Sequence, residues 1–227
     1  MDDEKFCSAP MAHSIKPACS VFGTCGGCAY QDKMYDVELA LKECFVKERM
    51  IETFAINEDT VDKIVASPKE LHYRQRIDLK LQRTRKGIMI GFTPKNGRGI
   101  LPIESCPIAL ESINQKIPTI KEEAIQQLPT KYRQANITIR SGDDGRVVWG
   151  GIGRGSLRLK EEDYLWTEIN GRRIFYAMET FFQANLSILP KLIEYIQGLD
   201  MIHAKTHLFD LYGGVGLFSV NLSDYVT

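Results

Sequence analysis

The sequence predicts an α+β fold: a central antiparallel sheet, preceded by an N-terminal cysteine-cluster loop and followed by the start of a Rossmann-like α/β domain. Three observations lead to this prediction. Three cysteines crowd into residues 19–28, paired apolar runs fill residues 73–178, and a glycine-rich turn follows an apolar run at residues 207–216. We expect four segments in chain order: an irregular N-terminus at 1–18, the cysteine loop with a helix at 19–60, the central sheet domain at 61–180, and an incomplete α/β domain at 181–227.

The cysteine loop is the most specific feature of the sequence. Cys19, Cys25 and Cys28 follow the spacing Cys-x5-Cys-x2-Cys, and Gly26 and Gly27 allow the backbone to turn sharply between the last two. Thiols this close in sequence can point to one centre, as a soft metal ion or an iron–sulfur cluster requires. The loop therefore predicts a metal or cluster site.

A fourth ligand is needed to complete a site of four thiolates. Cys106 is the best candidate, because Pro107 directly after it fixes the exit path of the chain. Zinc and an iron–sulfur cluster both stay open, since four thiolates suit either one. A disulfide framework is disfavoured, because no apolar signal-peptide region follows the N-terminus. Cys44, in a helical pattern, is expected to be a small apolar residue, and Cys7 receives no role.

Composition bounds the class of protein but not its partner. The chain has 227 residues, of which 44% are hydrophobic, so a packed core is expected and global disorder is not. Lys plus Arg and Asp plus Glu number 29 each, so any basic surface must be local. No apolar run approaches the roughly 20 residues of a membrane span. We expect a soluble, cytoplasmic protein with no membrane or protein partner.

The elements can be assigned from periodicity and turn residues. Residues 73–82 alternate closely, with Ile77, Leu79 and Leu81 expected on one face and Arg74, Arg76 and Lys80 on the other. Asn170-Gly171 is the strongest hairpin signal of the chain. The assignment comprises helices at 31–54, 107–128 and 186–196, hairpins at 73–82 with 87–92, 136–140 with 146–150 and 164–169 with 173–178, and a strand at 207–212 that leads into a helix at 217–222.

The glycine-rich turn at residues 210–216 resembles a nucleotide-binding loop. Glycines after a strand allow the backbone to approach a ligand closely. The loop lacks the full G-x-G-x-x-G spacing, which disfavours NAD. The word Asp-Leu-Tyr-Gly-Gly-Val-Gly instead looks like the first motif of class I S-adenosylmethionine-dependent methyltransferases.

Six short sequence motifs along the chain resemble those of one family, the bacterial iron–sulfur RNA uracil-C5 methyltransferases that methylate 23S ribosomal RNA. They occur in the family's order and cover most of the chain from about residue 19 onward. The motifs are Cys19-x5-Cys25-Gly26-Gly27-Cys28, Tyr73-Arg74-x3-Asp78, Gly91-Phe92, Ile103-Glu104-Ser105-Cys106-Pro107-Ile108, Phe181-Phe182-Gln183-Ala184-Asn185 and the loop at 210–216.

The resemblance implies two cofactors and an RNA substrate, with 23S rRNA the expected target. A 4Fe–4S cluster with a structural or RNA-supporting role would be ligated by Cys19, Cys25, Cys28 and Cys106. S-adenosylmethionine would be contacted by Gln183 and Tyr212, above a loop of Gly213, Gly214 and Gly216. Phe181 would stack near the target base and Arg74 would touch RNA. Without the resemblance, Phe181 would be a core aromatic and Arg74 a residue of a solvated strand face.

Two departures from the family change what we expect. No small RNA-binding barrel precedes the cysteine loop, which bears on substrate choice. The chemistry also needs a cysteine thiolate that adds to C6 of uracil, so that C5 can attack the methyl group. No cysteine follows Cys106. The catalytic nucleophile and base are therefore expected beyond Thr227, and the 227-residue chain alone is expected to be inactive, with its last strand and helix poorly supported.

Three other functions compete with this interpretation. A non-catalytic iron–sulfur or zinc module would bind RNA, with a salt-dependent affinity and no turnover. A zinc-stabilised structural domain would hold zinc and show no colour. An NAD-dependent oxidoreductase is the most distant alternative. Metal content and RNA binding separate them.

Overall fold

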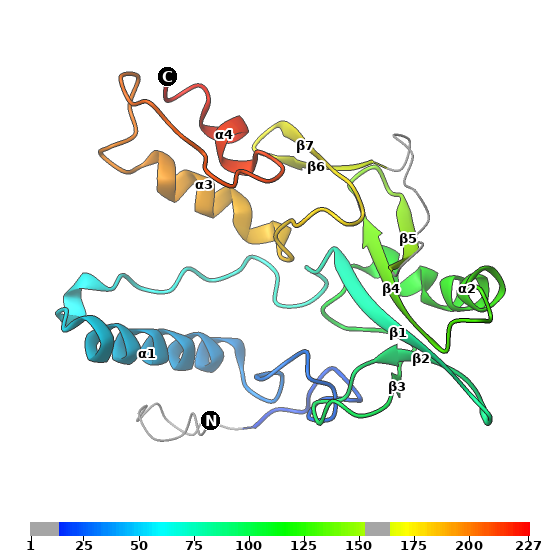
Figure 1. Cartoon of the computed structure of the whole chain (residues 1–227). Helices are drawn as coiled ribbons and strands as arrows, with labels where there is room; N and C mark the ends of the chain where they lie inside the picture. The colour runs from blue at the N-terminus through cyan, green and yellow to red at the C-terminus, as the bar shows by residue number, and fades with distance from the viewer. Residues whose placement is uncertain (1–13, 153–163) are drawn as a thin grey trace.

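The computed structural model describes residues 14–152 and 164–227 (Figure 1). The first part holds a long helix α1 (Tyr35–Phe54), a short turn η1 (Glu58–Thr60), the strands β1 (Arg76–Thr84), β2 (Gly87–Phe92) and β3 (Leu101–Pro102), the helix α2 (Glu111–Gln127), and the strands β4 (Gln134–Ser141) and β5 (Val147–Ile152). The second part holds the hairpin β6 (Leu165–Ile169) and β7 (Arg172–Tyr176), the turn η3 (Leu186–Ile188), and the helices α3 (Leu189–Gln197) and α4 (Leu217–Leu222).

A five-stranded antiparallel sheet forms the centre of the molecule. Its strand order is β3-β2-β1-β4-β5, so two hairpins lie side by side through the pairing of β1 with β4. The alternation predicted for β1 is confirmed: Ile77, Leu79 and Leu81 are each 1% exposed. Ile113 and Ile117 on the buried side of α2 belong to the same core as these strands. One face of the sheet is therefore apolar and covered by α2 (Figure 1).

The helix α2 runs through Pro118. A proline inside a helix removes one backbone donor and usually costs stability. Four side chains of α2 are buried in the core around it, Ile113, Ile117, Ile120 and Ala124. We infer that their burial offsets the lost hydrogen bond.

The third predicted hairpin forms, but it does not join the central sheet. β6 and β7 make a separate two-stranded sheet around the turn Asn170-Gly171, whose φ angles are 51° and 75°. Two positive φ angles are typical of the tight turn that an Asn-Gly pair favours. This hairpin packs with α3 and α4 in a second core. The expectation of one antiparallel sheet is therefore corrected to two sheets with two cores.

The strand predicted at residues 207–212 is absent from the structure. The segment is extended but belongs to no strand among the described residues. Two backbone bonds tie its start to the end of the chain, from Leu208 N to Thr227 O at 3.2 Å and from Thr227 N to Thr206 O at 2.7 Å. Phe209 and Leu211 are 80% and 81% exposed. An apolar run becomes a strand only when another strand lies alongside it, so this prediction was wrong for the chain described.

The helix α1 is confirmed, yet it lies apart from both cores, and none of its residues is buried (Figure 1). Two side chains tie it to the segment that follows: Tyr35 Oη accepts from Ser67 N at 2.8 Å, and Glu43 Oε2 accepts from Ile64 N at 2.9 Å. Cys44 on this helix is disulfide-bonded, so its prediction as a simple apolar residue was wrong. Cys7 lies outside the described residues. Across the described ranges, no helix is both long and apolar enough to cross a membrane.

Candidate functional site

The four cysteines predicted as ligands line one cavity. Cys19, Cys25 and Cys28 come from the loop before α1, and Cys106 comes from the segment between β3 and α2. The cavity has a volume of about 250 Å³, and Arg74 and Asp78 also line it. The three loop cysteines are half-buried and Cys106 is buried. Residues nearly ninety positions apart in the sequence thus meet at the same place.

Backbone contacts hold the cysteine loop against the central sheet domain. Cys25 forms an isolated β-bridge with Pro94, and Lys95 N donates to Thr24 O at 2.8 Å. A Cβ at Gly26 would lie 3.6 Å from the Lys95 backbone, an ordinary contact distance. The loop therefore lies directly on the connection between β2 and β3.

Cys106 is positioned by a side chain that the sequence did not single out. Asn114 Oδ1 accepts from Cys106 N at 2.8 Å, and Asn114 Nδ2 donates to Cys106 O at 3.0 Å. Both backbone groups of the cysteine are thereby satisfied by one amide from the first turn of α2. This fixes the direction in which the Cys106 thiol leaves the backbone.

Gln31 connects two of the other cysteines. Its Nε2 donates to Cys28 Sγ at 3.2 Å, and its Oε1 accepts from Cys19 N at 3.1 Å. Burial raises the pKa of the Cys28 thiol, the bond from Gln31 and the Arg74 charge lower it, and Cys25 and Cys19 raise it. Burial likewise raises the pKa of Cys106. A bound metal would have to displace these protons, because the thiolate is the ligand.

The four thiols are donors that either a 4Fe–4S cluster or a single zinc ion could use. Four thiols are the ligands that 4Fe–4S clusters use, and a cavity of about 250 Å³ is much larger than one metal ion requires. Around one zinc ion the sulfurs would all lie about 2.3 Å from the metal. In residues 14–152 and 164–227, however, no three Cys, His, Asp or Glu side chains converge closely enough to hold a metal ion. In a cluster each thiolate binds a different iron, so the sulfurs stand further apart than they do around one ion.

Arg74 lies at this cavity rather than on an open strand face. Its backbone bonds Ile108 O at 2.7 Å and Leu110 N at 2.9 Å, so it joins the strand region of β1 to the segment that carries Cys106. Its Nε atom is buried without a hydrogen-bond partner in the described structure. A cation beside several thiolates favours their charged form.

A second group of predicted residues lies where the chain leaves β7. Phe181 is 78% exposed and Gln183 is exposed, whereas Phe182 between them is buried in the second core. Phe182 packs against Tyr176, with the ring centroids 5.1 Å apart and the ring planes tilted by 38°. The alternation presents Phe181 and Gln183 outward from a fixed backbone. Phe181 is therefore not a core aromatic.

Arg140 on β4 fixes the backbone of the segment that follows β7. It is 0% exposed, and its Nη1 donates to Ala177 O at 2.8 Å and to Thr180 O at 2.7 Å. Burial lowers its pKa to about 10. Gln75 Nε2 donates to Gln183 O at 3.3 Å, and Gln75 Oε1 accepts from Tyr176 Oη at 2.8 Å. Buried polar groups of the central sheet domain thus fix the segment that carries Phe181 and Gln183.

The glycine loop is ordered by its own aspartate. Asp210 Oδ2 accepts from Ser219 N at 3.2 Å, and Gly216 N donates to Gly213 O at 2.8 Å. Tyr212 has a φ of 60° and is fully exposed, and Gly214 and Gly216 also have positive φ angles. Val215 and Leu217 contact the same core as Phe182. The two segments predicted to face S-adenosylmethionine are therefore built on one core.

No family model matches the sequence, but individual proteins do. A tRNA (uracil(54)-C(5))-methyltransferase of Schizosaccharomyces pombe is 32% identical over 221 residues, which is 90% of this chain and 40% of that protein. A 23S rRNA (uracil(1939)-C(5))-methyltransferase RlmD of Aliivibrio fischeri is 21% identical over 92% of this chain and 54% of its own length. Both of these homologues of the chain are named as RNA uracil-C5 methyltransferases.

Other relatives are named only as RNA methyltransferases. An uncharacterized RNA methyltransferase of Thermotoga maritima is 27% identical over 92% of this chain and 57% of its own length. The chain thus spans about half the length of the curated relatives it matches, between 40% and 57% for these three.

The fold also matches a solved structure. The Pyrococcus abyssi tRNA (uracil-54, C5)-methyltransferase, in complex with S-adenosyl-L-homocysteine, superposes with a TM-score of 0.65 over 89% of this chain and 57% of that one. The sequence identity is 18%, so this match concerns the fold alone.

Proposed function

We propose that this chain is the cluster-bearing and RNA-binding part of an S-adenosylmethionine-dependent RNA uracil-C5 methyltransferase. The observation that carries the proposal is the match over nine tenths of the chain to RNA uracil-C5 methyltransferases, one of them 32% identical. The relatives include enzymes named for transfer RNA and for 23S rRNA. Our sequence-based expectation of 23S rRNA stays part of the proposal.

A 4Fe–4S cluster would be held by Cys19, Cys25, Cys28 and Cys106. Their shared cavity, the amide of Gln31 at Cys28 and the cation of Arg74 support this assignment. When bound, the cluster would stabilise the junction between the cysteine loop and the sheet domain. Arg74 would then lie beside the cluster and also contact RNA.

The segment after β7 and the glycine loop would serve the methyl donor and the base. Gln183, Tyr212, Gly213, Gly214 and Gly216 would contact S-adenosylmethionine, as the resemblance of their motifs implies. The exposed ring of Phe181 offers a flat apolar face to a flipped uracil. Its backbone is fixed by Arg140, so the ring would need little ordering on binding.

The methyl transfer itself requires a thiolate near the uracil. Uracil C5 becomes a carbon nucleophile only after a thiolate adds to C6, and the C5 proton must then leave to a base. Cys106 is buried and is assigned to the cluster, and residues 107–227 contain no cysteine. We therefore propose that these 227 residues bind RNA without methylating it.

The proposal is tested by metal content first. The chain purified without oxygen should contain about four iron and four sulfide per molecule, and Cys25→Ser should abolish both. Ser105→Ala is the matched control, because it changes the wall of the same cavity without removing a thiol. One zinc and no colour would support the alternative of a zinc RNA-binding module. Methylation of uracil in RNA by the purified chain would contradict our proposal that these 227 residues are inactive.

A further inference from the structure

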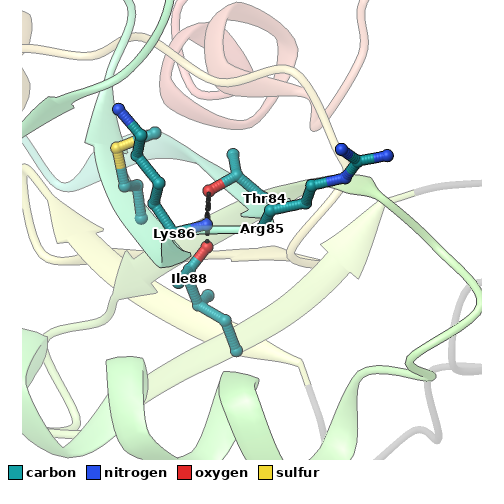
Figure 2. Close-up of a pocket in the computed structure, with 6 residues that line it drawn as sticks. Thr84, Arg85, Lys86 and Ile88 are labelled. Carbon is teal, nitrogen blue, oxygen red and sulfur yellow. Dashed lines mark hydrogen bonds between the residues drawn. The ribbon is translucent and has the colours of Figure 1, made fainter.

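The turn between β1 and β2 carries two exposed cations at its tip. The register pairs Thr84 with Gly87, so Arg85 and Lys86 form the turn, and both are exposed. Thr84 Oγ1 accepts from Lys86 N at 3.1 Å and donates to Gly87 O at 3.0 Å (Figure 2). The turn is thus ordered by its own side chain. It projects from the side of the molecule away from α3 and α4 (Figure 1).

The charge around this turn is of one sign, although the whole chain is neutral. Residues 79–103 contain no Asp or Glu, and their basic residues are Lys80, Arg83, Arg85, Lys86, Lys95 and Arg98. Among the described residues, neither Arg85 nor Lys86 forms an ion pair. Two unpaired surface cations on an ordered turn favour an anionic partner.

A neighbouring loop extends the basic surface. Arg83 N donates to Arg133 O at 2.8 Å, which brings the loop between α2 and β4 alongside the hairpin. Lys131 and Arg133 in that loop are exposed. Arg83 itself is committed to the fold, because its Nη2 donates to Leu128 O at 2.9 Å near the carboxyl end of α2. We call Arg85, Lys86, Lys131 and Arg133 the hairpin patch.

Apolar atoms lie beside the cations. A cavity of about 420 Å³ at the turn is lined by residues 84–89, including Ile88, which is 39% exposed, and Met89 (Figure 2). The Arg85 and Lys86 side chains extend away from each other in this view. A nucleotide presents both matching chemistries, since its phosphate is anionic and its base has an apolar face.

We propose that the hairpin patch binds single-stranded RNA, as a contact separate from the cysteine cavity and from the segment at Phe181. Phosphates pair with Arg85 and Lys86, and an unstacked base lies against Ile88, which is 39% exposed. A single strand fits better than a duplex, because only unpaired bases expose their faces. An acidic peptide matches the charge but has no base to place against the exposed Ile88 side chain. The inference rests on the proposed function, since it assigns a further part of the RNA-binding surface.

The test measures binding of a fluorescein-labelled oligouridine strand to the full 227-residue chain over a range of salt concentrations. R85A/K86A should bind about tenfold more weakly at low salt, the loss expected for two exposed ion pairs. The slope of log K against log salt should fall by about 1.4, from two lost phosphate contacts on a single strand. The charge-preserving R85K/K86R should bind as the wild type does.

The matched control is K69A/K205A, which removes two exposed lysines from segments outside the hairpin. Circular dichroism of each variant checks that the fold is retained. If the wild type binds oligouridine and the two double variants R85A/K86A and K69A/K205A bind it with equal affinity, this inference is overturned and the proposed function stands. No wild-type binding to oligouridine or to a stem-loop RNA would overturn both. Tighter binding of polyglutamate than of oligouridine would overturn the RNA assignment in favour of an acidic protein partner.

Discussion

Single side chains from distant parts of the sequence determine how the candidate site is held. Arg140 has no exposed surface, yet its guanidinium serves three backbone carbonyls after β7 and lies 4.3 Å from the centre of the Tyr176 ring. A buried cation is costly unless its donors are satisfied, and two of its nitrogens, Nε and Nη2, lack partners in the described structure. The carbonyls and the ring therefore provide the compensation that keeps Arg140 buried.

The first prediction concerns this residue. Arg140→Met leaves the carbonyls of Ala177 and Thr180 without their donor, so we expect a loss of about 3 kcal/mol in the free energy of unfolding. Urea unfolding measures it. Arg173→Met is the control, because Arg173 also lies 4.3 Å from an aromatic ring, that of Trp166, but is exposed. It should lose less than about 1 kcal/mol. Equal losses would show that the carbonyl bonds of Arg140 contribute nothing.

The gathering of the four cysteines at one cavity could be predicted from the sequence, and the residues that position them could not. Cys19, Cys25 and Cys28 are close in sequence, and the proline after Cys106 marked the fourth. Gln31 and Asn114 act through contacts that depend on the fold, and isolated amides give no signal in a sequence. The role of Arg140 could not be predicted either, because it lies in an alternating strand pattern in which a charged residue is normally solvent-exposed.

At the scale of elements, local signals were sufficient and non-local ones were not. Each hairpin formed where the sequence predicted it, since a turn and the two runs beside it lie within about twenty residues. The segment at 207–212 required a neighbouring strand and found none among the described residues. The join of β1 with β4, which creates the central sheet, links residues about sixty positions apart and had no local marker.

The attachment of α1 gives a second prediction. Bonds from Ile64 N and from Lys47 lower the pKa of Glu43 below its ordinary value of 4.5. A carboxyl whose folded pKa is lowered stabilises the folded state above its unfolded pKa, and this contribution is lost as pH falls through the folded pKa. Wild type should therefore unfold at a higher urea concentration than Glu43→Gln at neutral pH. The two midpoints should converge as the pH falls below the folded pKa of Glu43, which lies under its ordinary value of 4.5.

Glu52→Gln is the control on the same helix. Glu52 pairs with Arg49 at 3.0 Å on the exposed surface and accepts no backbone bond from the segment at 61–67. Exposed helix pairs contribute little, so its midpoint should stay near that of wild type at neutral pH. A gap between wild type and Glu43→Gln that persists unchanged into acid would contradict the role of the Glu43 carboxylate.

At the scale of the whole molecule, the overall neutrality conceals an uneven distribution of charge and of apolar surface. Basic residues gather on the hairpin side, while exposed apolar residues gather in the part that follows β7. Phe181, Phe209, Leu211 and Tyr212 are each at least 78% exposed. Neighbouring exposed apolar side chains mark a binding surface or an aggregation risk. The composition alone predicted neither concentration, because it counts residues without placing them.

The last prediction follows from the exposed run at residues 209–211. The purified chain should bind the dye ANS and associate as its concentration rises, because Phe209 and Leu211 offer apolar surface that is covered by nothing in the described structure. F209S/L211S should reduce both effects. F54S/V65S is the control, since it removes two side chains that are 63% and 55% exposed but lie on separate segments. Equal ANS fluorescence from the two double variants, with equal oligomer content by light scattering, would show that the run at 209–211 is not the surface responsible.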